Sequence, residues 1–421
     1  MRNIDKIINY FKQLTHYFSA SLIPMLLNLL INPLVSVSMD PEDFAIVGYF
    51  TSFSTLIAPI VAFYMIHYYN KRYFEIEEHE REHLRAVLYK ALIFFSFPVT
   101  IVCILLLLIY MQFSVEVSFK TFPYLYLALM TIPFTGIYNL ELADYKMKRK
   151  SKEYLKLSMI KGIGIVVMVL LLVVLLKYGA IGKLLATLIL DVGVFVYILL
   201  KHKDIWQIKT NIKEIYPVLK FCWPLALGAA LGYFSNGYDK AVLESLGDVT
   251  EFGYYCVGLS IAGYLSVFTA SISSTFQPDT YEAIINDDKK RILRVVAIRF
   301  ILTLFVVIVF ILFCPLVVRI LTAGKYMDSV PYARIAAFVA LSSSLYYIIN
   351  DYSIARGKPQ LYLITTIIGS MMIFILMPIF VRAYSFRGGA IMNVLSYIVL
   401  FVINLVLLQF NKRRNEDIMD H

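Results

Sequence analysis

The residues of this chain that could take part in chemistry are a few charged side chains inside long apolar stretches. Asp191 is the most deeply placed, with ten largely apolar residues before it and nine after it. A charge at the centre of a bilayer costs about 2.5–3.5 kcal/mol on insertion scales, so we expect each one to have a purpose. We predict that Asp191 binds a proton or a cation whose movement drives that of another solute. The alternative is an ion pair that joins two helices, with Lys161 as the partner.

Two basic residues, Lys90 and Arg299, are 209 residues apart, and each lies about one helical turn inside an apolar stretch. Cations in such positions are suited to binding an anionic cargo as it enters a cavity in the membrane. The alternative is snorkelling, in which a long basic side chain near a helix end extends to the lipid headgroups.

The motif Asp-Tyr-x-x-x-Arg occurs twice, from Asp144 to Arg149 and from Asp351 to Arg356. An Asp and an Arg five residues apart lie on different faces of a helix, so each needs a partner elsewhere. We predict two ion pairs, Asp144 with Arg356 and Asp351 with Arg149, that close a cytoplasmic gate. The alternative is that these groups cap their own helix ends and contact headgroups.

Polar residues also lie within or at the end of two other apolar stretches. Asn28 and Asn236 are 208 residues apart, and Asp239 and Lys240 end the second of these stretches. We predict that the four residues line a cavity, with Asp239 and Lys240 near its outer mouth. The alternatives are interhelical hydrogen bonds for the asparagines and a charge pair among the headgroups for Asp239 and Lys240.

Nothing in the sequence indicates covalent catalysis or a bound metal. The patterns GxxxxGK[ST], HExxH and GxSxG do not occur. The four cysteines each lie in an apolar run and form no CxxC, which argues against a zinc site and a disulfide framework. We therefore expect that the protein is not an enzyme, with no catalytic residues, no metal and no cofactor.

The composition indicates which elements must position these residues. Of the 421 residues, 60% are hydrophobic and 16% are charged, and the mean hydropathy is +0.73. Soluble proteins are about 45–50% apolar and about a quarter charged, so a water-soluble enzyme is excluded, and so is a disordered chain. We predict an all-α membrane protein with about twelve spanning helices, at 15–37, 43–68, 86–111, 121–144, 157–177, 180–200, 216–238, 250–275, 292–315, 330–350, 360–381 and 388–410.

The positions of lysine and arginine predict the orientation. If the N-terminus is cytoplasmic, 27 of the 39 basic residues lie in inside segments and 9 in outside segments. This excess predicts an N-in/C-in protein with an even number of spans. Orientation therefore accounts for most of the net charge of +10. The short connections argue against a membrane enzyme with a globular catalytic loop.

The segment 201–215 separates the sixth and seventh predicted spans. Its isoleucines recur at three- and four-residue spacing, with lysines on much of the other face. This pattern predicts an amphipathic helix on the cytoplasmic membrane surface, and the alternative is an ordinary charged loop.

Short matches indicate an internal repeat. Asp43-Phe44-Ala45 resembles Glu251-Phe252-Gly253 at an offset of 208, the sequences ending at Lys90 and Arg299 match at 209, and the two Asp-Tyr motifs match at 207. We predict two six-helix bundles, 1–208 with the linking helix near 201–215, and 209–421. An even number of spans per half implies a pseudo-two-fold axis along the membrane normal.

The sequence around the seventh predicted span resembles that of polysaccharide-type flippases of the multidrug/oligosaccharidyl-lipid/polysaccharide exporter superfamily. The shared features are a span that contains Pro224 and ends in Asp239-Lys240, and Glu251-Phe252-Gly253 opening the next span. The resemblance implies a flippase of the bacterial plasma (inner) membrane. It would move undecaprenyl-pyrophosphate-linked oligosaccharide repeat units by alternating access, for O-antigen, capsule or exopolysaccharide synthesis.

The alternative is a cation-coupled drug or small-molecule antiporter of the same superfamily. Its best-known coupling acid in the first span has no counterpart here, because 15–37 contains no Asp or Glu. For the flippase we expect the lipid-linked oligosaccharide, membrane lipids, a polysaccharide polymerase and glycosyltransferases as partners, and no nucleic acid. An H+ or Na+ gradient would be coupled through Asp191. The predicted substrate-cavity residues are Asn28, Lys90, Lys161, Asn236, Asp239, Lys240 and Arg299.

Overall fold

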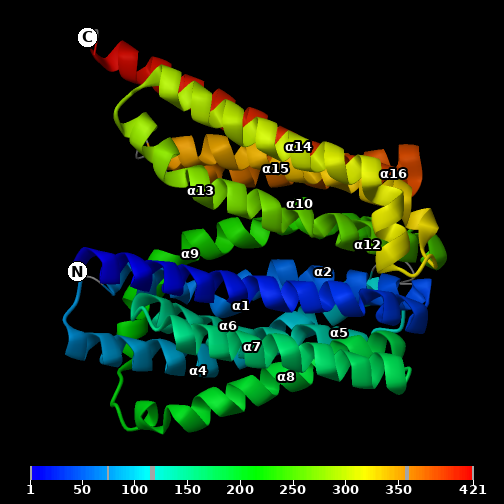
Figure 1. Cartoon of the computed structure of the whole chain (residues 1–421), viewed down its shortest axis with the longest axis horizontal. Coiled ribbons are helices and arrows are strands. Elements are labelled where there is room, and N and C mark those ends of the chain that lie inside the picture. The colour runs from blue at the N-terminus through cyan, green and yellow to red at the C-terminus, as the bar shows by residue number, and fades with distance from the viewer. Residues whose placement is uncertain (1, 74, 114–118, 356–359, 420–421) are drawn as a thin grey trace. The chain divides into compact units, whose positions relative to one another are not determined.

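The computed structural model describes residues 2–73, 75–113, 119–355 and 360–419, and within them every regular element is a helix (Figure 1). The chain divides into two compact units, Met1–Ala230 (unit 1) and Leu231–His421 (unit 2). The prediction of an all-α protein is confirmed for these residues. The repeat boundary near 208 stays a prediction. The units divide after Ala230 because of how one helix packs, and this division does not test a repeat.

In its described residues, unit 1 contains nine α-helices, a π-helical turn and two short 3-10 turns. The helix α7 continues directly into the π-helical turn, so that together they form one rod. The elements are α1 (Arg2–Ser38), α2 (Pro41–Ala62), α3 (Met65–Arg72), α4 (Glu78–Phe113), α5 (Tyr124–Leu129), α6 (Thr131–Met147), α7 (Ser151–Val169), η1 (Leu170–Leu175), α8 (Gly179–Lys201), η2 (Lys203–Trp206), η3 (Ile212–Glu214) and α9 (Ile215–Leu231).

Unit 2 is arranged around α15, which contacts α12, α13, α14 and α16. Its elements are α10 (Tyr233–Asn236), α11 (Tyr238–Glu244), α12 (Val249–Gly263), α13 (Leu265–Ile285), α14 (Lys289–Leu321), η4 (Met327–Ser329), α15 (Val330–Ala355) and α16 (Gln360–Met419).

Acidic residues mark where several helices begin. Asp40 and Asp43 form a capping box at the start of α2, and Pro41 occupies the first turn, where a missing N–H has no cost. Asp248 accepts a hydrogen bond from the backbone N–H of Glu251 at 2.9 Å, and Asp288 accepts one from that of Arg291 at 3.0 Å. Each carboxylate satisfies a free N–H and favours the positive end of the helix dipole.

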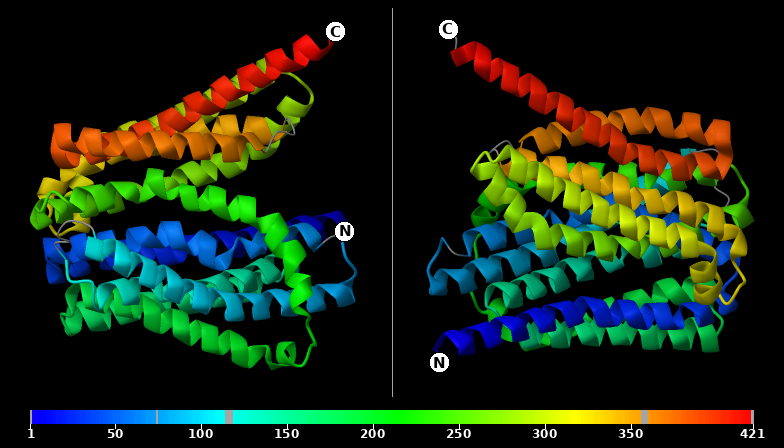
Figure 2. Two further views of the ribbon diagram at one scale, coloured as in Figure 1. Left: turned by 180° about the vertical axis from the view of Figure 1, so that it is seen from behind. Right: turned by 45° about the horizontal axis from the view of Figure 1, so that its top comes forward.

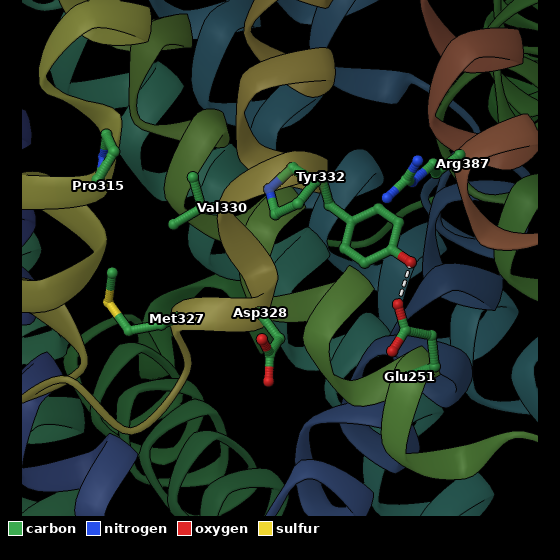
Figure 3. Close-up of a pocket in the computed structure, with 8 residues that line it drawn as sticks. Glu251, Pro315, Met327, Asp328, Val330, Tyr332 and Arg387 are labelled. Atoms are coloured by element: carbon green, nitrogen blue, oxygen red, sulfur yellow. Dashed lines mark hydrogen bonds between the residues drawn. The ribbon is translucent and has the colours of Figure 1, made fainter.

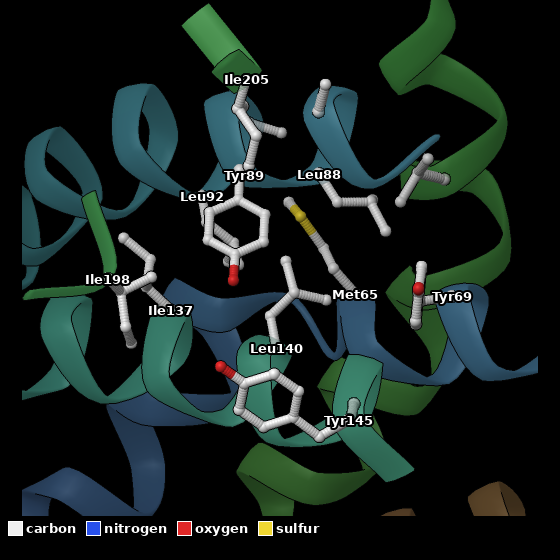
Figure 4. Packing of buried hydrophobic residues seen from close by; sticks show 14 of the residues in the cluster. Met65, Tyr69, Leu88, Tyr89, Leu92, Ile137, Leu140, Tyr145, Ile198 and Ile205 are labelled. Carbon is white, nitrogen blue, oxygen red and sulfur yellow. The ribbon is translucent and has the colours of Figure 1, made fainter. Parts of the chain in front are cut away.

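The side chains at one end of unit 1 form a packed cluster from α3, α4, α6, α8, η2 and α9 (Figure 4). Met65, Leu88 and Leu140 are almost fully buried in it. Tyr89 on α4 and Tyr145 on α6 direct their hydroxyls into the space between the two helices. Val218 and Cys222 also belong to the cluster, which explains why α9 is part of unit 1.

Ten helices of the described chain have the length and hydropathy of a membrane span, and twelve were predicted. One difference arises because the predicted span 121–144 is broken at Met130 into the short helices α5 and α6. The other arises because the last two predicted spans are the two limbs of α16, which the chain joins without a loop. The two-bundle arrangement, the pseudo-two-fold axis and the N-in/C-in orientation stay predictions.

The two limbs of α16 meet at Ser385, whose φ of 53° and ψ of −140° are not helical. Figure 2 shows the chain reversing direction there, between the orange and red parts of the ribbon. Gly388 lies so close to the first limb that a Cβ on it would overlap the carbonyl oxygen of Phe380. Glycine is therefore required for the tight approach.

The predicted amphipathic helix over 201–215 is wrong. The segment contains two short 3-10 turns, η2 and η3, separated by extended backbone. Ile205 is buried against unit 1, but Ile212 is 82% exposed, so the isoleucines do not share one apolar face. Other side chains of unit 1 bind this segment at separate points. Lys90 binds its backbone at Ile208, and His83 binds the side chain of Glu214, so these contacts override the helical periodicity.

We predict that Gly388→Ala lowers the free energy of unfolding by about 1–3 kcal/mol, because the added methyl group has no room beside Phe380. The matched control is Gly193→Ala in α8, where a Cβ meets no atom within 4 Å. Thermal unfolding in detergent would measure both. Equal midpoints for the two variants would contradict the tight approach.

Candidate functional site

Several of the charged residues predicted from the sequence lie in buried clusters inside each unit. We name the clusters after their central residues: the Asp191 pair and the Glu141 network in unit 1, and the Asp239 cluster and the Arg299 cluster in unit 2. Each brings together side chains from two or more helices. Because the interior has a low effective dielectric, each charge needs a nearby partner.

The Asp191 pair joins three helices of unit 1. Lys161 Nζ on α7 lies 2.6 Å from Asp191 Oδ1 on α8, and the hydroxyl of Thr135 on α6 donates to Asp191 Oδ2 at 3.2 Å. Lys161 also lies over the ring of Tyr138, with Nζ 4.2 Å from its centroid. The partner expected from the sequence is therefore present, whereas the coupling role of Asp191 stays a prediction.

The Glu141 network lies at the end of α6 and was missed by the sequence reasoning. Glu141 is fully buried and accepts hydrogen bonds from Tyr89 and from His202, the latter at 2.8 Å. Arg85 Nη2 and Lys201 Nζ each lie 3.5 Å from its carboxylate. Two cations and a histidine thus surround one carboxylate.

Asp144 lies one helical turn beyond Glu141 and extends the network. Its carboxylate accepts from the hydroxyl of Tyr69 at 2.5 Å, and it lies 3.0 Å from Lys148 and 3.7 Å from Arg85. Burial, followed by the neighbouring Asp144 carboxylate, raises the pKa of Tyr69 well above its ordinary value, so the phenol keeps its proton and donates. The three-residue spacing of Glu141 and Asp144 in an apolar stretch is a signal for two acids on one helix face, but it does not identify their partners.

The predicted cross-bundle gate pairs stay predictions. Arg356 lies outside the described residues. Arg149 is exposed at the turn between α6 and α7, with a φ of 55°. Asp144 and Asp351 both have partners within their own units.

Lys90 binds the segment between α8 and α9. Its Nζ donates to the carbonyl oxygen of Ile208 at 2.6 Å. His83 Nε2 and a carboxylate oxygen of Glu214 lie 2.8 Å apart, and Phe94 contacts the edge of Trp206. We name residues 202–214 the linker strap, because these contacts hold it against α4.

The Arg299 cluster occupies the corresponding place in unit 2 with different partners. The guanidinium of Arg299 on α14 is 1% exposed and donates to Asp351 on α15 at 3.2 Å. It also donates to Ser273 at 2.9 Å and to Thr280 at 3.2 Å on α13. Lys90 and Arg299 are therefore equivalent in sequence but bind different groups.

The Asp239 cluster joins α11, α12 and α16. Asp239 is fully buried, and Oδ2 accepts from the hydroxyl of Tyr255 at 2.5 Å and from the amide of Asn393 at 3.0 Å. Lys240 Nζ lies 3.3 Å from the same oxygen. Asn393 was missed by sequence reasoning because, unlike Asn28 and Asn236, it has no asparagine at the repeat offset of 208.

The repeat-related asparagines make equivalent bonds in the two units. Asn28 donates to the carbonyl of Pro24 at 2.9 Å, and Asn236 to that of Gly232 at 3.1 Å, in each case four residues earlier. Asn236 also accepts from the hydroxyl of Tyr397 at 2.7 Å. Each amide therefore binds the preceding turn of its own helix, and in unit 2 the carbonyl of Gly232 also accepts the backbone N–H of Ser235 at 3.1 Å.

Long apolar helices with ion pairs buried among them define a multi-pass membrane protein, and several solved structures share its fold. A multidrug resistance MATE family transporter of the MOP superfamily, in an inward-facing conformation, matches with a TM-score of 0.73 and 16% identity, over 95% of this chain and 99% of that one. The lipid II flippase MurJ, in an inward closed conformation, matches at 0.70 and 18%, over 93% and 86%. A MOP superfamily transporter from Pyrococcus furiosus matches at 0.64 and 15%, over 94% and 96%.

The sequence model of the family described as "Polysaccharide biosynthesis protein" matches residues 11–278, and the chain belongs to this family. No curated protein matches the sequence. The predicted resemblance to polysaccharide-type members of the superfamily is confirmed, and the chain is a multi-pass protein of the inner membrane. Within the described residues, no group of three or more His, Cys, Asp or Glu side chains could hold a metal ion.

We predict that Asp191→Leu alone and Lys161→Met alone each lower the free energy of unfolding by about 3–5 kcal/mol, because each leaves a buried charge without its partner. The double variant Asp191→Leu/Lys161→Met should regain most of the loss. Thermal unfolding of the purified protein measures this, with Lys203→Gln on the exposed linker strap as the control. Single variants as stable as the wild type would show that the pair is not formed.

Proposed function

We propose that this protein flips undecaprenyl-pyrophosphate-linked oligosaccharide repeat units across the plasma membrane by alternating access, for O-antigen, capsule or exopolysaccharide synthesis. The observation that carries the proposal is membership of a polysaccharide biosynthesis family by a chain with the fold of MOP superfamily transporters. A transporter fold in a polysaccharide biosynthesis family is explained if the protein's step in biosynthesis is to move an intermediate across the membrane.

The fold comparison supports a lipid-linked cargo. The matched structure of MurJ is described as a flippase for lipid II, and its fold covers 93% of this chain. A protein of the same fold can thus admit a large lipid and carry it across a bilayer. The cargo, the polymerase and the glycosyltransferases that act before and after this step belong to the proposal.

The charge distribution in the buried pairs supports an anionic cargo. In the Asp191 pair, the side chain of Lys161 is 14% exposed and that of Asp191 is 2% exposed. In the Asp239 cluster, Lys240 is 15% exposed and Asp239 is fully buried. The accessible end of each pair is therefore the cation, which is the group that would bind a pyrophosphate. Arg299 is the exception, because it is more deeply buried than Asp351.

The proposal gives Asp191 the role of coupling acid for an H+ or Na+ gradient. The Asp191 carboxylate is held by the ammonium of Lys161 and the hydroxyl of Thr135. If the ammonium moved to another anion, the carboxylate would lose its charged partner and could take up a proton or a cation. Lys240 and Lys161 would contact the pyrophosphate, and Asn28 and Asn236 would be polar groups of the cavity.

A cation-coupled drug or small-molecule antiporter of the same superfamily is the second candidate. It is favoured by the TM-score of 0.73 to a multidrug transporter. The absence of Asp and Glu from 15–37 and the family match argue for the flippase.

The test is reconstitution into vesicles with a fluorescent polyprenyl-pyrophosphate oligosaccharide. We expect transbilayer movement, reduced about tenfold or more by Lys240→Gln, because a hydrogen bond to a charged group contributes about 1.5–3 kcal/mol. Lys203→Gln, which removes a charge from the exposed linker strap, is the matched control and should move the lipid at the wild-type rate. Transport of a cationic dye with no movement of the lipid would instead establish the antiporter.

The coupling role is tested in the same vesicles with Asp191→Asn, which removes the titratable charge and keeps Lys161, the proposed contact to the pyrophosphate. We expect that a proton or sodium gradient changes the rate of lipid movement by the wild type but not by the variant. A rate that responds equally to the gradient in both proteins would remove Asp191 from the coupling step.

A further inference from the structure

A cavity of about 460 Å³ opens at one end of unit 2 (Figure 3). It is formed by the start of α12, the end of α14, the turn η4 with the start of α15, and the start of the second limb of α16. Its polar lining consists of Glu251, Asp328, Tyr332 and Arg387, and Pro315 and Met327 supply apolar surface. Cavities of this size take small molecules, since binding pockets are typically about 300–1,000 Å³.

The polar groups of this pocket face one another. The hydroxyl of Tyr332, a residue that is 4% exposed, donates to the carboxylate of Glu251. Figure 3 shows the guanidinium of Arg387 beside the Tyr332 ring and the carboxylate of Asp328 on the open side. Among the described residues no ion pair involves Arg387 or Asp328, so their hydrogen-bonding capacity is available to a ligand.

The acid at the repeat-related position of unit 1 has a packing role. Asp43, which the repeat aligns with Glu251, accepts from the backbone N–H of Ala180 at 2.8 Å and so fixes the start of α8. Gly179 has a φ of +50°, and a Cβ on it would overlap the Asp43 carboxylate. The same offset of 208 aligns Gly179 with Arg387.

Unit 2 thus differs from unit 1 at both partners of this contact. An arginine occupies the position of the glycine, and the acid bonds to Tyr332 and not to a helix N-terminus. The packing role that explains Asp43 does not explain Glu251, and the result is an open pocket of mixed charge. A difference between two copies of one repeat indicates a separate task for the second copy.

The chemistry of the lining selects a class of ligand. Two carboxylates accept hydrogen bonds from hydroxyls, a guanidinium donates to hydroxyl or ring oxygens, and the apolar side chains suit the C–H face of a sugar ring. An inorganic anion is disfavoured because two carboxylates outnumber one guanidinium. A divalent cation is disfavoured because the described residues offer no group of three metal ligands.

We propose that this pocket binds a sugar residue of the transported oligosaccharide at the outer face of the membrane. The proposal rests on the proposed function and on the predicted orientation, which places 245–249, 322–329 and 385–389 outside. Its size allows about one or two sugar rings. The pocket would hold the saccharide as the cargo leaves, while the lipid part stays in the bilayer.

The binding test is saturation-transfer-difference NMR on the purified full chain, with glucose, N-acetylglucosamine and glucuronate as probes. We expect saturation transfer to at least one sugar, reduced at least about fivefold in Arg387→Gln and in Tyr332→Phe, which removes one hydroxyl. The matched control is Arg382→Gln, an exposed arginine on α16 that does not line the pocket. Asp328→Asn, at an exposed carboxylate of the lining, should reduce the transfer as well.

The outcomes separate this proposal from the proposed function. No transfer to any of the three sugars, or equal transfer in wild type and Arg387→Gln, overturns the pocket, even if the wild type flips the lipid-linked oligosaccharide. Sugar binding that Arg387→Gln removes, in a wild-type protein that does not move the lipid, supports the pocket and overturns the flippase.

Discussion

The cost of placing charge in a low-dielectric interior is the constraint on which the described structure depends. Asp191, Asp239, Glu141 and Arg299 are each almost fully buried, and each has an oppositely charged partner from its own unit. Neutral donors complete the shells, for example Tyr255 and Asn393 around Asp239. The helices are therefore joined in specific registers, because removing one member of a pair exposes the full desolvation cost of the other.

Several of the buried charges could be predicted from the sequence, because a charged residue inside an apolar stretch is rare and easily recognised. The all-helical class follows from composition, and the ion pair of Lys161 with Asp191 is the alternative that the sequence offered to a coupling role. The Glu141 network does not follow from the sequence, since Arg85, His202 and Tyr89 meet only when α4, α6 and the linker strap are packed together. The prediction for the linker strap was wrong for the same reason. Its isoleucine spacing is helical, but Lys90 binds its backbone at Ile208 and its own His202 side chain binds Glu141.

The predicted repeat aligns residues whose contacts in the two units are in part alike and in part different. Asn28 and Asn236 keep the same bond to a carbonyl four residues earlier. Lys90 binds a backbone carbonyl whereas Arg299 binds a carboxylate, and Asp43 fixes a helix start whereas Glu251 faces a pocket. Divergence of this kind lets a repeated fold become asymmetric without a change in its helices.

The linker strap has a consequence for how the polypeptide could be divided. Segments between two repeats are the usual place to cut a gene so that its halves can be produced as separate chains. Here a cut between 208 and 211 would leave α9 bound to unit 1 through Val218 and Cys222, and Glu214 bound to His83. The two fragments would share one packed interior, so they should reassemble as a split protein without any designed association domain.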